Sequence, residues 1–228
     1  MYNNRGGGFW DSFPAVTKNI IIINLLVWLG SVTLPSILAQ KFGIRFDPTD
    51  MMGLHYVGSE KFNLAQFFTY MFMHDTSSIG HVFFNMFSVF MFGRTLELVM
   101  GRKIFLLYYL LTGVGAAIVQ QIVWAYMGVG GSMYVDYFVT VGASGSVFGI
   151  LLAFGMLFPQ TPLYLMFIPV PIKAKYFVIF YGLFELFMGV RGTGDGIAHW
   201  AHLGGMIFGY LFIMQWKKRI RNNGSNRF

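Results

Sequence analysis

Apolar segments long enough to cross a bilayer as helices divide the sequence. They lie at about residues 18–39, 80–100, 104–127, 141–158, 174–190 and 197–216. A transmembrane helix needs about 20 predominantly apolar residues. The fourth and fifth segments are separated by four prolines, which forbid one continuous helix there: Pro159, Pro162, Pro169 and Pro171. The pattern predicts an all-α membrane protein, a bundle of six transmembrane helices whose core spans residues 18–216.

The connection between the first two segments, roughly residues 40–79, is the longest. It mixes charged residues with large apolar ones: Asp47, Asp50, Glu60 and Lys61 beside Met51, Met52, Phe67, Phe68, Phe72 and Met73. Such a mixture predicts a long first loop that lies partly in the membrane interface.

The composition agrees with a membrane protein of one domain. The chain is 56% hydrophobic and 11% charged, whereas a soluble domain carries about 25% charged residues. So few charges cannot cover a water-soluble globule of this size. The sequence has no cysteine, which excludes disulfides and thiolate metal or redox sites.

The basic residues predict how the chain is oriented. With six spans both termini lie on one side, and that side holds twelve of the 16 Lys and Arg residues. The excess places both termini in the cytoplasm, with a short N-terminal segment at 1–17 and a basic tail at 217–228. Because the positive charges flank apolar spans, the net charge of +7 indicates orientation and not nucleic-acid binding. No cleavable signal or organellar presequence is recognised, so we expect a bacterial plasma membrane.

Polar groups open each of the three predicted spans that run inward. The second span opens with His81 to Asn85, the fourth with Gly142 to Gly145, and the sixth with His199 to His202. All three sets therefore lie at a similar depth, slightly below the outer surface. Polar side chains inside a bilayer are costly and usually functional, so this depth is the expected position of a site.

Helical spacing predicts which of these groups meet. Gly145 and Gly149 form one GxxxG pair, and Gly205 and Gly209 form another, a spacing that lets two helices approach closely in lipid. Packing through these glycines would bring the hydroxyl of Ser144 to the imidazole of His202. A hydroxyl and an imidazole within about 2.6–3.2 Å make a nucleophile and its general base.

The same region offers donors for an oxyanion. His81 and Asn85 are four residues apart and project from one helix face, so their ring N–H and amide can act together with the backbone N–H of Ser144. The Ser144 N–H lies near a helix N-terminus, where the dipole favours negative charge.

No acidic residue is predicted to orient His202. Asp136 and Asp195 fall in outer loops, so the sequence predicts a Ser–His dyad without a third carboxylate. Glu185 in the fifth span needs a partner that the pattern does not identify, and His199 is predicted at the membrane interface. We expect Gln120 and Gln121 to make interhelical hydrogen bonds.

These motifs resemble those of the rhomboid family of intramembrane proteases, from about Phe67 to Gly209. They are His-x-x-x-Asn at the second span, Gly-x-Ser-Gly at the fourth, and Ala-His-Leu-Gly-Gly-x-x-x-Gly at the sixth. The resemblance implies that Ser144 is the nucleophile, that His202 is its base, and that His81 and Asn85 form the oxyanion hole. It also implies cleavage of single-span membrane proteins near the outer end of their helix, without metal or cofactor, with substrate access between the second and fifth spans and a gate around 187–196.

The sequence departs from the family pattern at three places. Phe148 stands where the family usually has a tyrosine that packs on the catalytic histidine, so the stacking should remain without the hydroxyl. The stretch 75–80 is longer than usual, and the Trp-Arg pair often found in the first long loop is missing. The last two differences concern the loops and not the predicted chemistry.

Three other functions remain beside the protease. A haem or metal carrier could use His81 and His202 as ligands of one centre, although the neighbouring Ser144 and Asn85 are not what that chemistry needs. A transporter is disfavoured because the spans show no inverted repeat. A pseudoprotease that only binds transmembrane clients is disfavoured because Ser144 and His202 are both present. The sequence specifies neither the oligomeric state nor the natural substrate.

Overall fold

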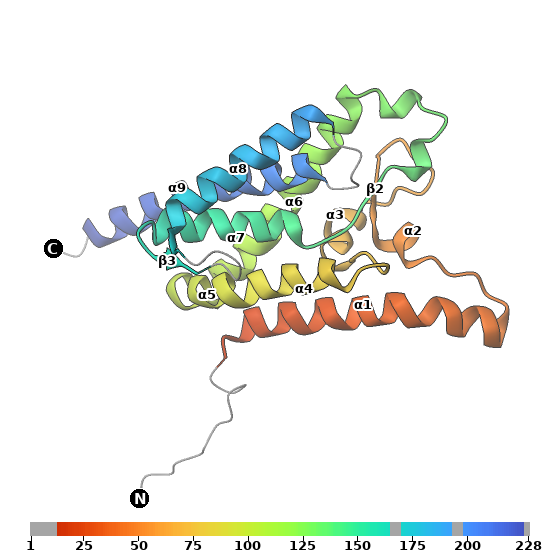
Figure 1. Cartoon of the computed structure of the whole chain (residues 1–228), viewed down its shortest axis with the longest axis horizontal. Helices are drawn as coiled ribbons and strands as arrows, with labels where there is room; N and C mark the ends of the chain where they lie inside the picture. Colours follow the sequence, from red (N-terminus) through yellow and green to blue (C-terminus); the bar gives the residue numbers. More distant parts are fainter. Residues whose placement is uncertain (1–12, 165–169, 193–197, 226–228) are drawn as a thin grey trace, which may run out of the picture.

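The computed structural model describes residues 13–164, 170–192 and 198–225 of the chain. Its long helices are α1 (Ala15–Phe42), α4 (Ile79–Ser88), α5 (Arg94–Met100), α6 (Arg102–Tyr126), α7 (Ser144–Leu157), α8 (Ala174–Arg191) and α9 (His199–Ser225). A five-residue π-helical turn, η2 (Val89–Gly93), joins α4 to α5. Figure 1 shows these helices as one bundle, with α7 in its middle and α1 at one edge beside α4.

Each predicted apolar segment coincides with helix, and the ends differ by a few residues, except that α9 continues to Ser225, nine residues beyond the predicted end at 216. Among the described residues, three helical stretches are long and apolar enough to cross a membrane: Ala15–Phe42, Ile79–Met100 and Arg102–Tyr126. Helix α7 is apolar but has only 14 residues. The chain is therefore a helical protein with membrane-spanning segments.

Helix α7 is enclosed by its neighbours because its own surface is nearly all apolar or small. Most of its residues are buried, Gly145 to Leu151 among them. It packs chiefly against α6 and α9, and α8 covers a further side. This 14-residue helix thus forms the centre of the core, and its first residue is Ser144.

Helix α1 is attached to the bundle through a buried carboxylate of α5. Glu97 accepts hydrogen bonds from the backbone N–H groups of Val16 and Thr17 and from the Thr17 hydroxyl, at 2.7–3.0 Å. The first N–H groups of a helix have no partner within it, and an ionised acceptor satisfies them well. Glu97 therefore ties the start of α1 to the end of α5.

The connection between α1 and α4, residues 43–78, folds onto the bundle. It contains α2 (Pro48–Met52), β1 (Leu54–His55), α3 (Gln66–Thr69) and the 3₁₀ turn η1 (Tyr70–Phe72). Strand β1 pairs antiparallel with β2 (Val139–Thr140), which leads into α7. The Tyr70 hydroxyl donates to the carbonyl of Gly113, and the Tyr70 carbonyl accepts from the N–H of Gly142. The connection thereby fixes the segment that precedes Ser144.

The prediction for Gln121 is wrong. Its side chain accepts from the N–H of Val57 and donates to the carbonyl of His55, so it bonds to the folded connection and not to another helix. No local pattern in the sequence indicates that this connection packs on α6. The Gln120 side-chain oxygen has no hydrogen-bond partner among the described residues.

The other connections are shorter than the one between α1 and α4. The 3₁₀ turns η3 (Val129–Gly131) and η4 (Val135–Tyr137) follow α6. Strands β3 (Pro162–Leu163) and β4 (Ile172–Lys173) pair antiparallel between α7 and α8, so the predicted break in the proline-rich stretch is present. Pro169, Asp195 and most of the predicted gate stretch beyond α8 lie outside the described residues.

Candidate active site

The hydroxyl of Ser144 and the imidazole of His202 meet at the centre of the site. The Nε2 atom of His202 lies 2.8 Å from Oγ of Ser144. Ser144 is the first residue of α7 and is half-buried, whereas His202 lies in the first turn of α9 and is 8% exposed. The distance is that of a hydrogen bond between a nucleophile and its base.

Glycines allow the two helices to approach closely enough for this contact. A Cβ atom added at Gly205 would overlap the carbonyl of Gly145, and one added at Gly209 would lie 3.3 Å from the Cα of Gly149. The GxxxG pairs of α7 and α9 therefore face each other, as their spacing predicts.

A carboxylate that the sequence did not assign lies behind His202. The Oε2 atom of Glu185, on α8, is 2.9 Å from Nδ1 of His202 and 2.6 Å from Nδ1 of His199. Because an ionised carboxylate only accepts hydrogen bonds, the hydrogen of the neutral His202 ring is on Nδ1. The lone pair of Nε2 then faces the Ser144 hydroxyl.

Two predictions are corrected by this arrangement. The expectation that no carboxylate in a neighbouring span contacts His202 is wrong, because Glu185 is 4% exposed and hydrogen-bonded to it. His199, expected at the membrane interface, is buried and bonded to the same carboxylate. Glu185 lies about two turns from the end of α8, and His202 lies in the first turn of α9. Counting depth along the predicted fifth span as well would have placed Glu185 and His202 at a similar depth.

His81 points its other ring nitrogen into the site. Its Nδ1 accepts a hydrogen bond from the backbone N–H of Asp75 at 3.2 Å, so the hydrogen of the neutral ring is on Nε2. That Nε2 atom would lie 2.9 Å from a Cβ atom added at Gly142. Gly142 has φ of 127°, a conformation that favours glycine, and it leaves room for the His81 ring directly before Ser144.

The residues that hold His81 come from the stretch 75–80. Asp75 accepts from both the backbone N–H and the hydroxyl of Ser77, at 2.8 and 2.7 Å, and these hydrogen bonds lower the pKa of Asp75. The longer stretch thus forms a turn that presents the Asp75 N–H to His81. The sequence did not reveal this role because a backbone group performs it.

Asn85 lies one turn along α4 and is buried. Its amide donates to the carbonyl of His81 at 2.8 Å, which leaves the second amide hydrogen for another acceptor. Phe148, one turn beyond Ser144, stacks on His202 with ring centroids 4.2 Å apart and planes 10° from parallel. The predicted stacking is therefore present without the tyrosine hydroxyl.

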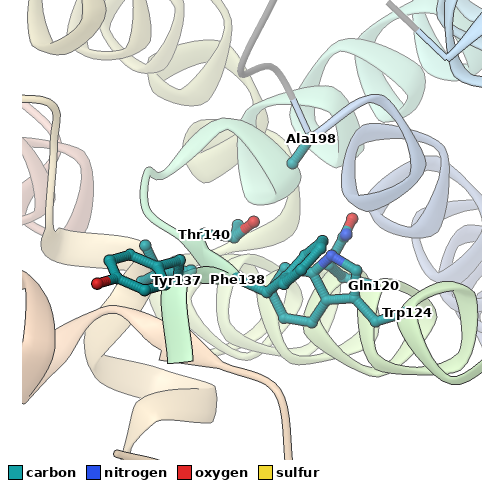
Figure 2. Close-up of a pocket in the computed structure, with 7 residues that line it drawn as sticks. Gln120, Trp124, Tyr137, Phe138, Thr140 and Ala198 are labelled. Atoms are coloured by element: carbon teal, nitrogen blue, oxygen red, sulfur yellow. The ribbon is translucent and has the colours of Figure 1, made fainter. Parts of the chain in front are cut away.

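A pocket of about 190 Å³ opens beside the start of α7 and α9. Figure 2 shows Thr140 and Ala198 on one side of it and Gln120 and Trp124, from α6, on the other. Thr140 and Ala198 each lie four residues before a member of the Ser144–His202 pair. The pocket thus lies next to the segments that carry the site.

The side chains that could hold a metal differ from the predicted pair of His81 and His202. Within the described residues, Glu185, His199 and His202 each place one ligand atom within 4.8 Å of the others. The hydrogen bonds from both imidazoles to Glu185 account for this proximity. A metal on Nδ1 of His202 would replace its bond to Glu185.

The fold and the site define a helical membrane protein with a hydrogen-bonded serine and histidine at the starts of two packed helices. The model of the rhomboid domain family matches residues 61–218, well over half of the chain and all of the site described above. The chain therefore belongs to the rhomboid family, which is known for intramembrane serine proteases. A search of curated proteins finds no match.

Proposed function

We propose that this protein is a serine endopeptidase that cleaves the transmembrane helices of single-span membrane proteins near the outer membrane face. The observation that carries the proposal is the 2.8 Å hydrogen bond between Oγ of Ser144 and Nε2 of His202. His202 takes the hydroxyl proton as Ser144 attacks the scissile carbonyl, and then gives it to the leaving amine. Water, activated by the same imidazole, releases the acyl group.

The oxyanion of the tetrahedral intermediate requires donors already in position. The backbone N–H of Ser144 is in the first turn of α7, where the helix dipole favours negative charge. The Nε2–H of His81 and the second amide hydrogen of Asn85 complete the proposed oxyanion hole, and both side chains are held by hydrogen bonds to the backbone. This chemistry uses no metal or cofactor.

The proposed membrane arrangement has six spans with both termini in the cytoplasm of a bacterium. Three of the helical stretches have the length and composition of spans. Helix α8 supports a fourth, because it exposes large apolar side chains: Ile179, Phe180, Leu183 and Phe187. Helix α7 is about 21 Å long at 1.5 Å per residue, shorter than the hydrocarbon core of about 30 Å. Ser144 at its start would then lie below the membrane surface.

The substrate must unwind locally, because a peptide bond within a helix is hydrogen-bonded and shielded. We propose that the substrate reaches the site between α4 and α8. The chain has no cysteine of its own. Two cysteines introduced at the outer ends of α4 and α8 can therefore cross-link only with each other within the chain. Cross-linking should abolish cleavage of membrane substrates, and reduction should restore it. Unchanged turnover in the cross-linked protein would exclude this route.

Cleavage of single-span reporter proteins in liposomes tests the function. Wild type should cleave a reporter within its membrane segment, and Ser144→Ala and His202→Ala should not. Ser146→Ala is the matched control, because Ser146 is buried two residues along the same helix and bonds to the carbonyl of Tyr109. Cleavage by Ser144→Ala equal to that of wild type would refute the proposal.

A further inference from the structure

Glu185 is a buried carboxylate about two turns before the end of the apolar helix α8. It is 4% exposed, and α8 around it consists largely of Phe, Leu, Val and Ile. Removing an ion from water costs several kcal/mol unless hydrogen bonds compensate. The compensation here comes from two imidazoles of α9, His199 and His202, which both bond to its Oε2 atom.

We propose that Glu185 is a positioning residue of the peptidase, so that the site works as a Ser144–His202–Glu185 triad. This inference rests on the proposed function and replaces the dyad that the sequence predicted. Glu185 does not touch the reacting atoms. It acts through Nδ1 of His202, on the ring edge opposite to Ser144.

The carboxylate has two effects on His202. It keeps the ring hydrogen on Nδ1, so the Nε2 lone pair always faces the Ser144 hydroxyl. In the other tautomer Nε2 carries the hydrogen and cannot accept the serine proton. When the hydroxyl proton moves to Nε2, the ring becomes a cation, and the nearby Glu185 charge stabilises it. The Nδ1 proton stays on the ring throughout, and Glu185 stays ionised.

His199 has a supporting part in the same arrangement. It lies three residues before His202, on the same face of α9, and its Nδ1 is 2.6 Å from the oxygen that His202 also contacts. This second bond fixes the position of Oε2 relative to His202. The pair also joins α8 to the first turn of α9, so a purely structural role must be separated from a role in the reaction.

Labelling by a fluorophosphonate at increasing probe concentrations separates the two roles. Ser144 displaces fluoride from phosphorus and gives its proton to His202, so the maximal labelling rate reports the base and the half-saturating concentration reports probe binding. Glu185→Gln should lower the maximal rate by roughly tenfold or more, since the corresponding Asp→Asn change in a chymotrypsin-type triad lowers kcat by about 10⁴, with little change in half-saturation. Glu185→Asp should have a maximal labelling rate between those of Glu185→Gln and wild type. His199→Gln should lower the maximal labelling rate less than Glu185→Gln does.

Glu97→Gln is the matched control, because Glu97 is an equally buried glutamate in another part of the bundle. It should lower the melting temperature and leave the maximal labelling rate unchanged. If wild type does not react with the probe, the proposed function fails. If wild type reacts and folded Glu185→Gln reacts within twofold of it, the function stands and the triad is refuted.

The nitrogen chemical shifts of His202 in the wild-type protein provide a second test that needs no variant to fold. The triad predicts that the neutral form of the ring carries its hydrogen on Nδ1 and has a bare Nε2. Hydrogen on Nε2 would overturn the inference.

Discussion

At the scale of single residues, the two histidines beside Ser144 have opposite hydrogen-bond roles. The Nδ1 of His81 accepts from a backbone N–H, which leaves Nε2 as a donor. The Nδ1 of His202 donates to Glu185, which leaves Nε2 as an acceptor. A neutral imidazole has one donor and one acceptor nitrogen, so the neighbour on the far side decides which role each ring has toward Ser144.

Phe148 offers a direct test of how the His202 ring is held. Phe148→Ala removes the ring that stacks on His202 at 4.2 Å and should destabilise the fold by about 3–5 kcal/mol, with slower labelling by the fluorophosphonate. Phe148→Tyr keeps the ring and should label within about threefold of wild type, since the ring supplies most of the contact. Thermal unfolding and labelling rates together check this. If Phe148→Ala were labelled as fast as wild type, stacking on His202 would be unnecessary for the reaction.

The sequence predicted the residues whose side-chain type and helix position both point to the site. Ser144, His202 and His81 open segments that were predicted to run inward, so their common depth could be counted. Glu185 was missed because depth was counted only for those segments, whereas Glu185 lies toward the end of a segment predicted to run outward. Asp75 acts through its backbone N–H, which every residue except proline has.

At the scale of elements, contact between α7 and α9 depends on the glycines between them. Gly205→Ala should push α9 away from Gly145, because the added Cβ overlaps the Gly145 carbonyl. We expect a lower melting temperature and a loss of labelling by at least tenfold, since small displacements at a catalytic pair cost about 10² in rate. Gly30→Ala is the control, because a Cβ at Gly30 on α1 would meet its nearest neighbour at 3.7 Å. A fully active Gly205→Ala would contradict this account of the packing.

His74, in the connection between α1 and α4, should make the stability of the protein depend on pH. Burial lowers the pKa of His74, outside the spanning helices, to about 4. Above about pH 6.5, the ordinary pKa of histidine, the ring is neutral in both the folded and the unfolded protein, so its contribution to folding is fully retained. As the pH falls from about 6.5 to 4, only the unfolded state binds the proton, and up to about 3 kcal/mol of stability is lost. The free energy of unfolding of wild type and of His74→Gln, measured at pH 7.5 and pH 5, tests this. If both proteins lose the same amount of stability between the two pH values, His74 is not the cause of the loss.

The helices themselves were the most predictable part of the fold. Length and hydropathy alone predicted six apolar segments, and each coincides with helix, because a bilayer-spanning segment must satisfy its backbone within itself. The pairing of β1 with β2 joins residues about 85 apart, and the π-helical turn at Val89–Gly93 interrupts an otherwise regular apolar run. Both depend on tertiary packing, which local patterns do not contain.

At the scale of the whole molecule, the 14-residue helix α7 lies at the centre, and longer helices such as α6 and α9 surround it (Figure 1). Helix α6 and helix α9 enclose α7, while the folded connection holds the segment before Ser144. The polar groups of the site are therefore supported both by neighbouring helices and by the folded connection. Such support keeps donors and acceptors in position before a substrate arrives, which is the condition for electrostatic stabilisation of a transition state.

The most direct test of the central claim is the position of the fluorophosphonate adduct on the intact protein. Peptide mapping by mass spectrometry should find one adduct, on Ser144 of wild type. It should be absent from Ser144→Ala, nearly absent from His202→Ala, and present at the wild-type level in Ser146→Ala. An adduct on another serine, or equal labelling of Ser144→Ala, would contradict the assignment of Ser144 as the nucleophile.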